Sequence, residues 1–231
     1  MLEEQPELGE RLPSDTQVQA RDLLRARALV WPDEQPGAIP PEVLAPGAFG
    51  LLVLDGWLGL RVESVGAQRL ELVGPGDLLR PWSMVDDVVM APARMGWRVV
   101  APARLAILDR AFAEAAARWP EIAEALMDRL VLRSRRLTLQ MTAEAQRRAE
   151  DRVLLVLWQL ADRWGNVTPG GIEIQVPLTH RMLADLTGTR RPPVTAAIGR
   201  LRRRGLLATS DSGRFVLTGA PPRDEHDLPS P

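Results

Sequence analysis

Between residues 49 and 108 the chain alternates short apolar runs with turn-forming residues. The runs FGLLVLDGWLGLRVESV, QRLELV and MGWRVVAPARLAILD have the apolar content of strands. The pair DG at residues 55–56 predicts a hairpin turn within the first run, and GPGD at 74–77 predicts a turn after the second. The pair AP at 101–102 divides the third run into two. Short strands with turns about every ten residues predict a small antiparallel barrel or sandwich.

Apolar residues at helical spacing mark two other stretches. A helix over residues 17–31 is predicted by Val18, Leu23, Leu24, Ala28 and Leu29. Prolines and glycines between residues 32 and 47 end it. A longer helix begins after the Trp-Pro pair at 119–120. Its apolar stripe, with spacings of 4, 4, 7 and 4, consists of Ile122, Leu126, Leu130, Leu137 and Met141.

This long stripe is similar to the seam of a coiled coil. A helix of about 28 residues is roughly 40 Å long, which exceeds what one small core covers. We therefore expect a partner helix to cover this stripe. The alternative is a helix that lies across its own β-rich domain.

The C-terminal part combines helices, tight turns and short strands. An apolar helix over 151–164 is followed by GG at 170–171 and the alternating run IEIQV, which predict a turn and a strand. Residues 178–207 predict two short helices separated by Gly188, and residues 207–217 predict a hairpin. The Pro-rich, acidic end of the chain predicts a disordered tail.

Composition excludes several kinds of chemistry. The 231 residues include no cysteine, which removes disulfides, thiolate zinc sites, iron–sulfur clusters and cysteine nucleophiles. The two histidines, His180 and His226, are too few for a histidine-rich metal site. Residues 40–110 contain none, so a cupin-type enzyme lacks its ligands. We expect no metal, no catalytic residue and no enzyme.

The chain shows no targeting or membrane signal. The N-terminal run MLEEQPELGERLPSD is acidic and lacks the apolar segment of a signal peptide. No apolar run reaches the roughly 18 residues that a membrane span requires. We expect a cytoplasmic protein without a membrane partner.

Charge is distributed unevenly behind the net value of −1. Residues 176–220 hold eight arginines against two aspartates, a net charge of +6. A compact basic module on an otherwise acidic chain is typical of nucleic-acid binding. A solvated, arginine-rich surface helix would give the same count.

The segment 178–207 has the features of a helix–turn–helix. Thr179 is placed to cap the first helix, and Gly188 lies where the turn needs a conformationally permissive residue. Pro192 and Pro193 fit the first turn of the second helix, because its N–H groups there have no intrahelical partner. The second helix has a buried stripe of Val194, Ile198 and Leu201.

The opposite face of this second helix is basic at its N-terminal end, which suits insertion into the major groove of double-stranded DNA. Arginine can bind guanine O6 and N7 together, and further arginines and hydroxyls can hold phosphates. The candidate DNA-contacting residues of this face are Arg190, Arg191, Thr195, Arg200 and, at the tip of the hairpin that follows, Arg214.

The order of these parts resembles the Crp/Fnr family of bacterial transcription regulators. The strongest similarity is LTHRMLADLTGTRRPPVTAAIGRLRRRGLL, followed by a hairpin in the place of the family's wing. LVGPGDLLRPW resembles the glycine turn of the family's cyclic-nucleotide-binding-like β-roll, and RRL at 135–137 resembles part of its dimerisation helix. The resemblance covers residues 15–220.

This resemblance implies an α+β fold with an N-terminal antiparallel β-roll (cupin-like), a long dimerisation helix and a C-terminal winged helix–turn–helix. It implies a flexible lead-in over 1–14, a sensor domain over 15–110, a dimerisation region over 111–149, a DNA-binding domain over 150–220 and a disordered tail over 221–231. A hinge is expected near 149–151. The resemblance also implies a homodimer on a pseudo-palindromic site, with RNA polymerase as a further partner. The five stripe residues of the long helix, Ile122, Leu126, Leu130, Leu137 and Met141, are then the candidate dimer interface.

Two positions of the second helix depart from the family. Arg191 matches the first base-reading arginine. Well-known members have Glu directly after it and a second Arg further along, where this chain has Pro192 and Ala196. The familiar half-site is therefore not expected. The resemblance implies phosphate contact for the region of Thr179, His180 and Arg181.

The sensor departs further. The family's Gly-Glu pair for ribose is absent, because RPW at 80–82 follows GDLL, and Arg94 is followed by Met95 rather than a hydroxyl residue. Gln140 and Met141 replace the polar pair that contacts adenine. We expect no cyclic AMP, and either another small effector or none. Two interpretations remain for Arg80, Trp82, Arg94 and Trp97. They form an anion site with aromatic walls, or the tryptophans pack in the core and the arginines are solvated.

A second functional hypothesis stays open. The chain would be a ligand- or partner-binding module whose degenerate helix–turn–helix does not read DNA specifically. It predicts weak binding without sequence preference, whereas the regulator predicts a defined palindrome.

Overall fold

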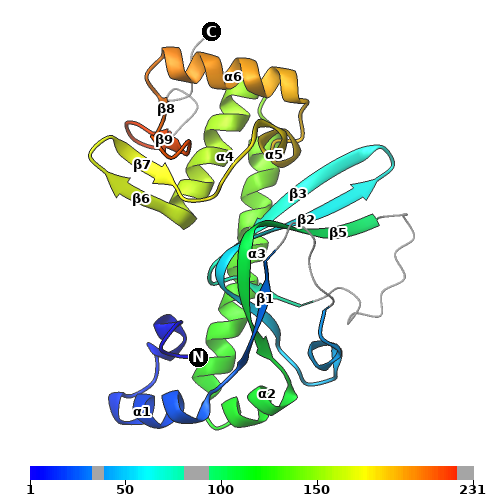
Figure 1. Ribbon diagram of the computed structural model, residues 1–231, viewed down its shortest axis with the longest axis vertical. Helices are drawn as coiled ribbons and strands as arrows, with labels where there is room; N and C mark the ends of the chain where they lie inside the picture. The colour runs from blue at the N-terminus through cyan, green and yellow to red at the C-terminus, as the bar shows by residue number, and fades with distance from the viewer. Residues whose placement is uncertain (33–38, 81–93, 223–231) are drawn as a thin grey trace. The chain divides into compact units, whose positions relative to one another are not determined.

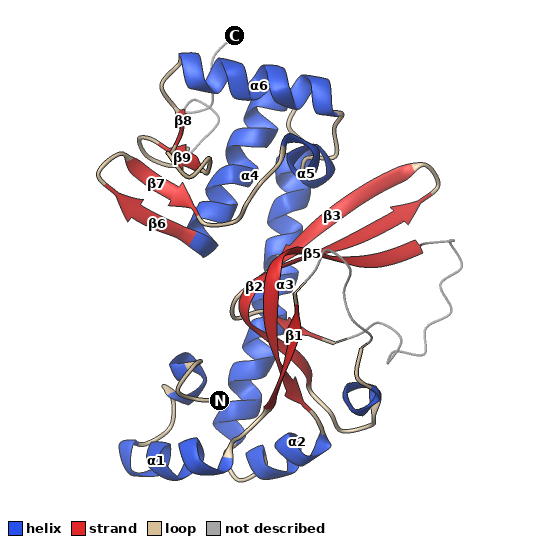
Figure 2. Cartoon of the chain, viewed as in Figure 1, coloured by secondary structure: helices blue, strands red, loops and turns tan. Residues whose placement is uncertain are grey.

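The structure is a computed structural model that describes residues 1–32, 39–80 and 94–222. It forms two compact units, one of Met1–Val65 and Leu72–Ser134, the other of Gly66–Glu71 and Arg135–Pro231. Helices and an antiparallel sheet occur in both parts of the chain, so the expected α+β class is confirmed (Figures 1 and 2). Among the described residues, no helix has both the length and the apolar character needed to cross a bilayer.

The N-terminal part is built on a five-stranded sheet of order β1-β5-β2-β3, with β4 paired to β2. Strand β5 pairs antiparallel with both β1 and β2. The strands are β1 (Arg27–Trp31), β2 (Gly50–Ser64), β3 (Ala67–Val73), β4 (Leu78–Leu79) and β5 (Arg94–Leu108). The helices before and after them are α1 (Ser14–Leu23), α2 (Arg110–Ala116) and α3 (Pro120–Glu144), with short 3₁₀ turns at Pro6–Gly9 and Pro41–Leu44.

Two apolar clusters form the core of this part. One fills the interior of the sheet and includes Trp31, Leu51 and Leu105. The other joins the sheet to the helices, with Phe112 of α2 and Trp119 among its members. Their burial is the main source of stability, at about 25 cal/mol per Å² of apolar surface removed from water.

The turn predicted at residues 55–56 is wrong. Strand β2 continues through this pair with irregular register against β5, and the hairpin turn lies after Ser64 instead. Gly56 has φ +79°, and a Cβ there would lie 1.9 Å from the carbonyl oxygen of Pro102. The glycine therefore forms a bulge where two backbones meet. Pro102 lies within the continuous β5, so the predicted division of that run is also wrong.

The helix predicted over 17–31 is too long. Helix α1 ends at Leu23, and residues 27–31 form β1, paired with β5 from Arg27–Ile107 to Trp31–Ala103. Apolar residues in this short run fit either period, and pairing with a neighbouring strand decided between them. The turn at 74–77 is confirmed: Gly76 has φ +85°, and the buried carboxylate of Asp77 accepts the N–H of Gly74 at 2.9 Å.

Helix α3 confirms the predicted long helix, but two of its stripe residues face inward. Ile122 and Leu126 are buried in the core of their own chain, with at most 1% of either residue exposed. They offer no surface to a second subunit, so their assignment to a dimer interface is wrong. Leu130 packs partly against the same core, whereas Leu137 and Met141 are exposed.

The C-terminal part begins with α4 (Ala149–Trp164), after four residues without helix. A four-stranded sheet of order β6-β7-β9-β8 and two further helices follow. These elements are β6 (Gly165–Thr168), β7 (Gly171–Ile174), α5 (His180–Leu186), α6 (Arg191–Arg203), β8 (Leu207–Thr209) and β9 (Phe215–Leu217). Helix α6 packs on α4 and α5 (Figure 1). The tail predicted from 221 lies, from 223 on, outside the described residues.

Candidate nucleic-acid interface

The helix–turn–helix has the predicted local structure. The hydroxyl of Thr179 caps α5 by accepting the N–H of Met182 at 3.1 Å. Gly188, with φ +61°, supplies the left-handed conformation of the turn, which costs glycine little. Arg190 is the N-cap of α6, and prolines occupy its first turn. The backbone conformation at the start of α6 is therefore determined by the residues of the turn itself.

Helix α6 has one buried and one exposed side. Its buried residues are Val194, Ala197, Ile198 and Leu201, which confirms the predicted stripe. Arg190, Arg191 and Thr195 are exposed at the N-terminal end. Within the described ranges, neither the Arg190 nor the Arg191 side chain has a hydrogen-bond or ion-pair partner. Two unneutralised guanidinium groups therefore lie at the helix end that the sequence assigned to base reading.

His180 connects the two helices of the motif. Its Nδ1 lies 3.0 Å from the hydroxyl of Thr195, and its ring stacks on Phe215 of β9 with centroids 6.4 Å apart. Burial lowers the pKa of His180, and the positive charges of Arg202 and Arg191 lower it further. The imidazole is therefore held neutral more firmly than a free histidine, next to the exposed face of α6.

Other arginines of the basic module are held by the protein itself. Arg200 donates from Nε to Glu150 of α4 at 2.6 Å, and Arg204 donates from Nη1 to the same carboxylate at 3.2 Å. Arg202 donates to the hydroxyl of Thr209 at 2.6 Å. The charge count of this segment therefore overstates the number of arginines available for phosphate.

Arg181 lies on α5 and is also paired. Its Nε lies 3.4 Å from a carboxylate oxygen of Asp185, one turn later. The side chain is largely exposed, so this contact is weak and can exchange with an external anion.

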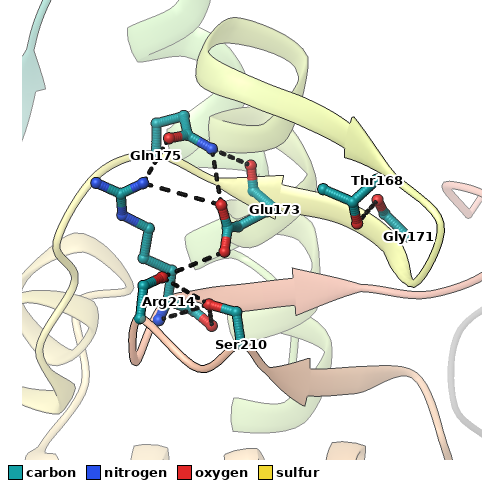
Figure 3. Close-up of polar contacts among 7 residues, drawn as sticks. Thr168, Gly171, Glu173, Gln175, Ser210 and Arg214 are labelled. Atoms are coloured by element: carbon teal, nitrogen blue, oxygen red, sulfur yellow. Dashed lines mark hydrogen bonds and ion pairs between the residues drawn. The ribbon is translucent and has the colours of Figure 1, made fainter.

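The β8–β9 hairpin is braced against β7 (Figure 3). Arg214 donates from Nη1 to Gln175 at 2.6 Å and lies 3.8 Å from Glu173, while Gln175 donates to Glu173 at 3.1 Å. The hydroxyl of Ser212 also reaches Glu173, at 3.3 Å. Hydrogen bonds lower the pKa of Glu173, and the bond from Ser210 has the largest effect. Arg214, predicted to contact DNA at the hairpin tip, therefore also fixes the hairpin.

Residues 151–219 match the family described as the Crp-like helix-turn-helix domain. The CRP-like cAMP-activated global transcriptional regulator of Mycobacterium tuberculosis is 28% identical over 178 residues, covering 74% of this chain and 76% of that protein. Regulatory protein CysR of Synechococcus elongatus is 30% identical over 151 residues, covering 64% of this chain and 65% of that protein. Residues 151–219 thus form a Crp-like helix-turn-helix domain, and the chain is similar to transcription regulators of the Crp/Fnr family. The homologues are regulators, a family without enzymatic activity.

Solved structures share the fold of this protein. A cyclic nucleotide-binding domain containing protein from Listeria monocytogenes has a TM-score of 0.67 at 12% identity, covering 83% of this chain and 88% of that chain. FixK2 from Bradyrhizobium japonicum has a TM-score of 0.62 at 18% identity, covering 90% of this chain and 99% of that chain. At these identities the likeness concerns the fold alone.

The predicted sensor site stays a prediction. Trp82 lies outside the described residues. Arg80 follows β4 and Arg94 begins β5, and both are exposed. Trp97 packs, partly buried, against the apolar cluster of the sheet. Within the described ranges, no hydrogen bond or ion pair joins these three. Gln140, noted at the adenine position, donates instead to the carbonyls of Leu70 and Leu186, at 3.2 and 3.0 Å.

Sequence reasoning missed several residues that bind arginines of the candidate DNA interface or are exposed on α3. Glu150, Glu173 and Gln175 hold arginines that lie 39 to 54 positions away in sequence, and no local pattern reveals such pairs. On α3, Met127 and Val131 are each 61% exposed and were also missed. A second apolar stripe, offset by one position from the predicted one, could have revealed them.

Proposed function

We propose that this protein is a sequence-specific DNA-binding regulator of the Crp/Fnr type that acts as a homodimer on a pseudo-palindromic site. The observation that carries the proposal is the N-terminal end of α6, where Arg190 and Arg191 are exposed and unpaired within the described ranges. A cationic helix end of this kind suits contact with base edges and the flanking phosphates. DNA binding also places the protein, in this proposal, in the cytoplasm.

The base-reading surface would be short. Arg191 is the candidate for a bidentate contact to guanine, and Thr195, one turn later, for a second base. Pro192 and Ala196 carry no hydrogen-bonding side chain, so they can only meet apolar groups such as the thymine methyl. The expected half-site therefore differs from that of family members with Glu and Arg at these positions. Thr179, His180, Arg181, Arg190 and Arg214 would serve the sugar–phosphate backbone.

Helix α3 supports the homodimer. Met127, Val131 and Met141 are exposed and, with Ser134 and Thr138 between them, follow a spacing of 4, 3, 4 and 3 residues. This alternation is the heptad seam of a two-stranded coiled coil. Leu137 flanks the seam. The proposed interface thus keeps Leu137 and Met141 from the sequence prediction and replaces Ile122 and Leu126 by Met127 and Val131.

The dimer can be tested at the centre of this seam. Val131→Asp places a charge at the helix contact and should convert a dimer into a monomer in sedimentation velocity. Leu132→Asp is the matched control, because Leu132 is also exposed but lies outside the seam. Equal dimerisation of both variants would contradict the assigned interface.

We propose that cyclic AMP is not an effector of this protein, because the sequence patterns that bind its ribose and phosphate are missing from the sensor. Any effector is then a different small molecule. The relative from Mycobacterium tuberculosis is described as cAMP-activated, so cyclic AMP is the ligand on which the two proteins should differ. Calorimetry with cyclic AMP should show no binding. RNA polymerase would be the further partner through which the bound regulator acts.

The proposed function is tested by selection of genomic DNA fragments with the purified full-length protein at physiological salt. The expected result is one palindromic motif. Fragments without a shared motif, both alone and with candidate nucleotides added, would contradict specific reading and favour a module that has lost it.

A further inference from the structure

The carboxylate of Glu150 joins the start of α4 to the C-terminal end of α6. Glu150 is the second residue of α4, which follows the four non-helical residues after α3. One oxygen accepts from Arg200 at 2.6 Å and the other from Arg204 at 3.2 Å. Only 9% of the Glu150 side chain is exposed, against 45% and 40% for the two arginines. The buried group is thus fully bonded, and its partners reach it from the surface.

This contact fixes the C-terminal end of α6, whose apolar stripe also packs on α4 and α5. Charge-assisted hydrogen bonds are short and directional, and burial strengthens them. From Arg204 to Arg191 the helix spans about 20 Å, so a tilt of about 5° at the anchored end moves Arg191 by about 2 Å. A hydrogen bond to a base edge does not survive such a shift, because donor and acceptor must lie within about 3.2 Å.

We propose that Glu150 is a positioning residue for sequence reading. It orients α6 through Arg200 and Arg204. By pairing with these two cations, it also prevents them from binding DNA phosphates independently of sequence. Glu150 therefore lowers affinity for arbitrary DNA while raising affinity for the correct site. This inference rests on the proposed function and adds a residue that touches no base.

Asp151 provides a matched control. It is the next residue of α4 and equally buried, at 7% exposure for each. Its Oδ1 has no hydrogen-bond partner among the described residues, and burial raises its pKa. Asp151→Asn and Glu150→Gln remove the same formal charge from neighbouring positions of α4, but only the second weakens the connection to α6.

The test measures affinity of full-length wild type, Glu150→Gln and Asp151→Asn for the selected operator and for a scrambled duplex, by fluorescence anisotropy. Glu150→Gln should lose about tenfold or more on the operator, the value of one good base contact, and bind the scrambled duplex more tightly. Asp151→Asn should keep the ratio of the two affinities. Opposite changes on the two duplexes cannot arise from partial unfolding, which weakens both.

Thermal melting and circular dichroism verify that each variant is folded. If Glu150→Gln does not fold, Arg200→Gln breaks the same contact from the exposed side. It should weaken operator binding without changing the salt dependence of scrambled-duplex binding. A slope reduced by about 0.9 per subunit would assign Arg200 to phosphate and overturn the inference.

The inference also fails if folded Glu150→Gln keeps the wild-type affinity ratio. A wild-type protein without operator preference would instead refute the proposed function, and this inference with it.

Discussion

The two ends of α6 use the same residue type in different ways. At the N-terminal end, Arg190 and Arg191 are exposed and lack ion-pair partners among the described residues. At the C-terminal end, Arg200 and Arg204 share the carboxylate of Glu150, and Arg202 donates to Thr209. The first pair can bind an external anion without giving up an internal bond, whereas the second group must first give up internal bonds. In the proposed function, the basic charge of this module therefore has two roles, recognition of DNA and anchoring of α6.

The largest effect should come from the reading end. Arg191→Ala should weaken operator binding by about 1–3 kcal/mol per half-site and relax preference at one base pair. Arg203→Ala is the control, because it removes an equal exposed charge from the other end of α6. Anisotropy with the operator and its single-base variants measures both. Equal losses for the two variants would abolish the distinction between the ends.

A smaller and uniform effect is expected at Arg190. As a phosphate contact it carries no sequence information, so Arg190→Ala should weaken all duplexes alike and reduce the salt slope by about 0.9 per subunit. Binding to the operator and to a scrambled duplex over a salt series measures both quantities. A change confined to the operator would move Arg190 from phosphate contact to base reading.

Arg214 should behave in an intermediate way. Its bonds to Gln175 and Glu173 compete with phosphate, so Arg214→Ala should reduce the salt slope by less than Arg190→Ala does. Gln175→Ala removes the 2.6 Å bond without changing charge and should leave the slope unchanged or raise it. If Arg214→Ala matched Arg190→Ala, the hairpin arginine would belong with the free cations.

The smallest effect is a pH dependence at His180. Its pKa is lowered in the folded protein, so the unfolded chain takes up the proton first as the pH falls below about 6.5. The stability that this histidine contributes is fully present above that pH and is lost on acidification. Thermal melts between pH 8 and 5.5 should therefore fall less steeply for His180→Gln, which keeps a donor for Thr195. Parallel curves would show that the group does not titrate in this range.

Sequence reasoning succeeded where the structure is decided locally. The cap at Thr179, the turn at Gly188 and the prolines that begin α6 each follow from the conformational preferences of one or two residues. The buried stripe of α6 follows from helical period. These features place the candidate DNA-reading face almost completely.

Sequence reasoning failed where contacts between distant parts of the chain determine the structure. Gly56 lies in a bulge rather than a turn because Pro102 meets it across the sheet. Ile122 and Leu126 face their own core because the β-domain offers an apolar surface that the stripe alone does not reveal. Glu150 could not be paired with Arg200 from sequence, since 50 residues separate them.

The most direct test of the account is the genomic selection carried out in parallel with wild type and Arg191→Ala. We predict a palindrome for the wild type, with half-sites about 10 base pairs apart, and a symmetric loss of preference at one position in each half for the variant. An identical motif from both proteins, or none from the wild type, would contradict the claim that the N-terminal end of α6 reads DNA sequence.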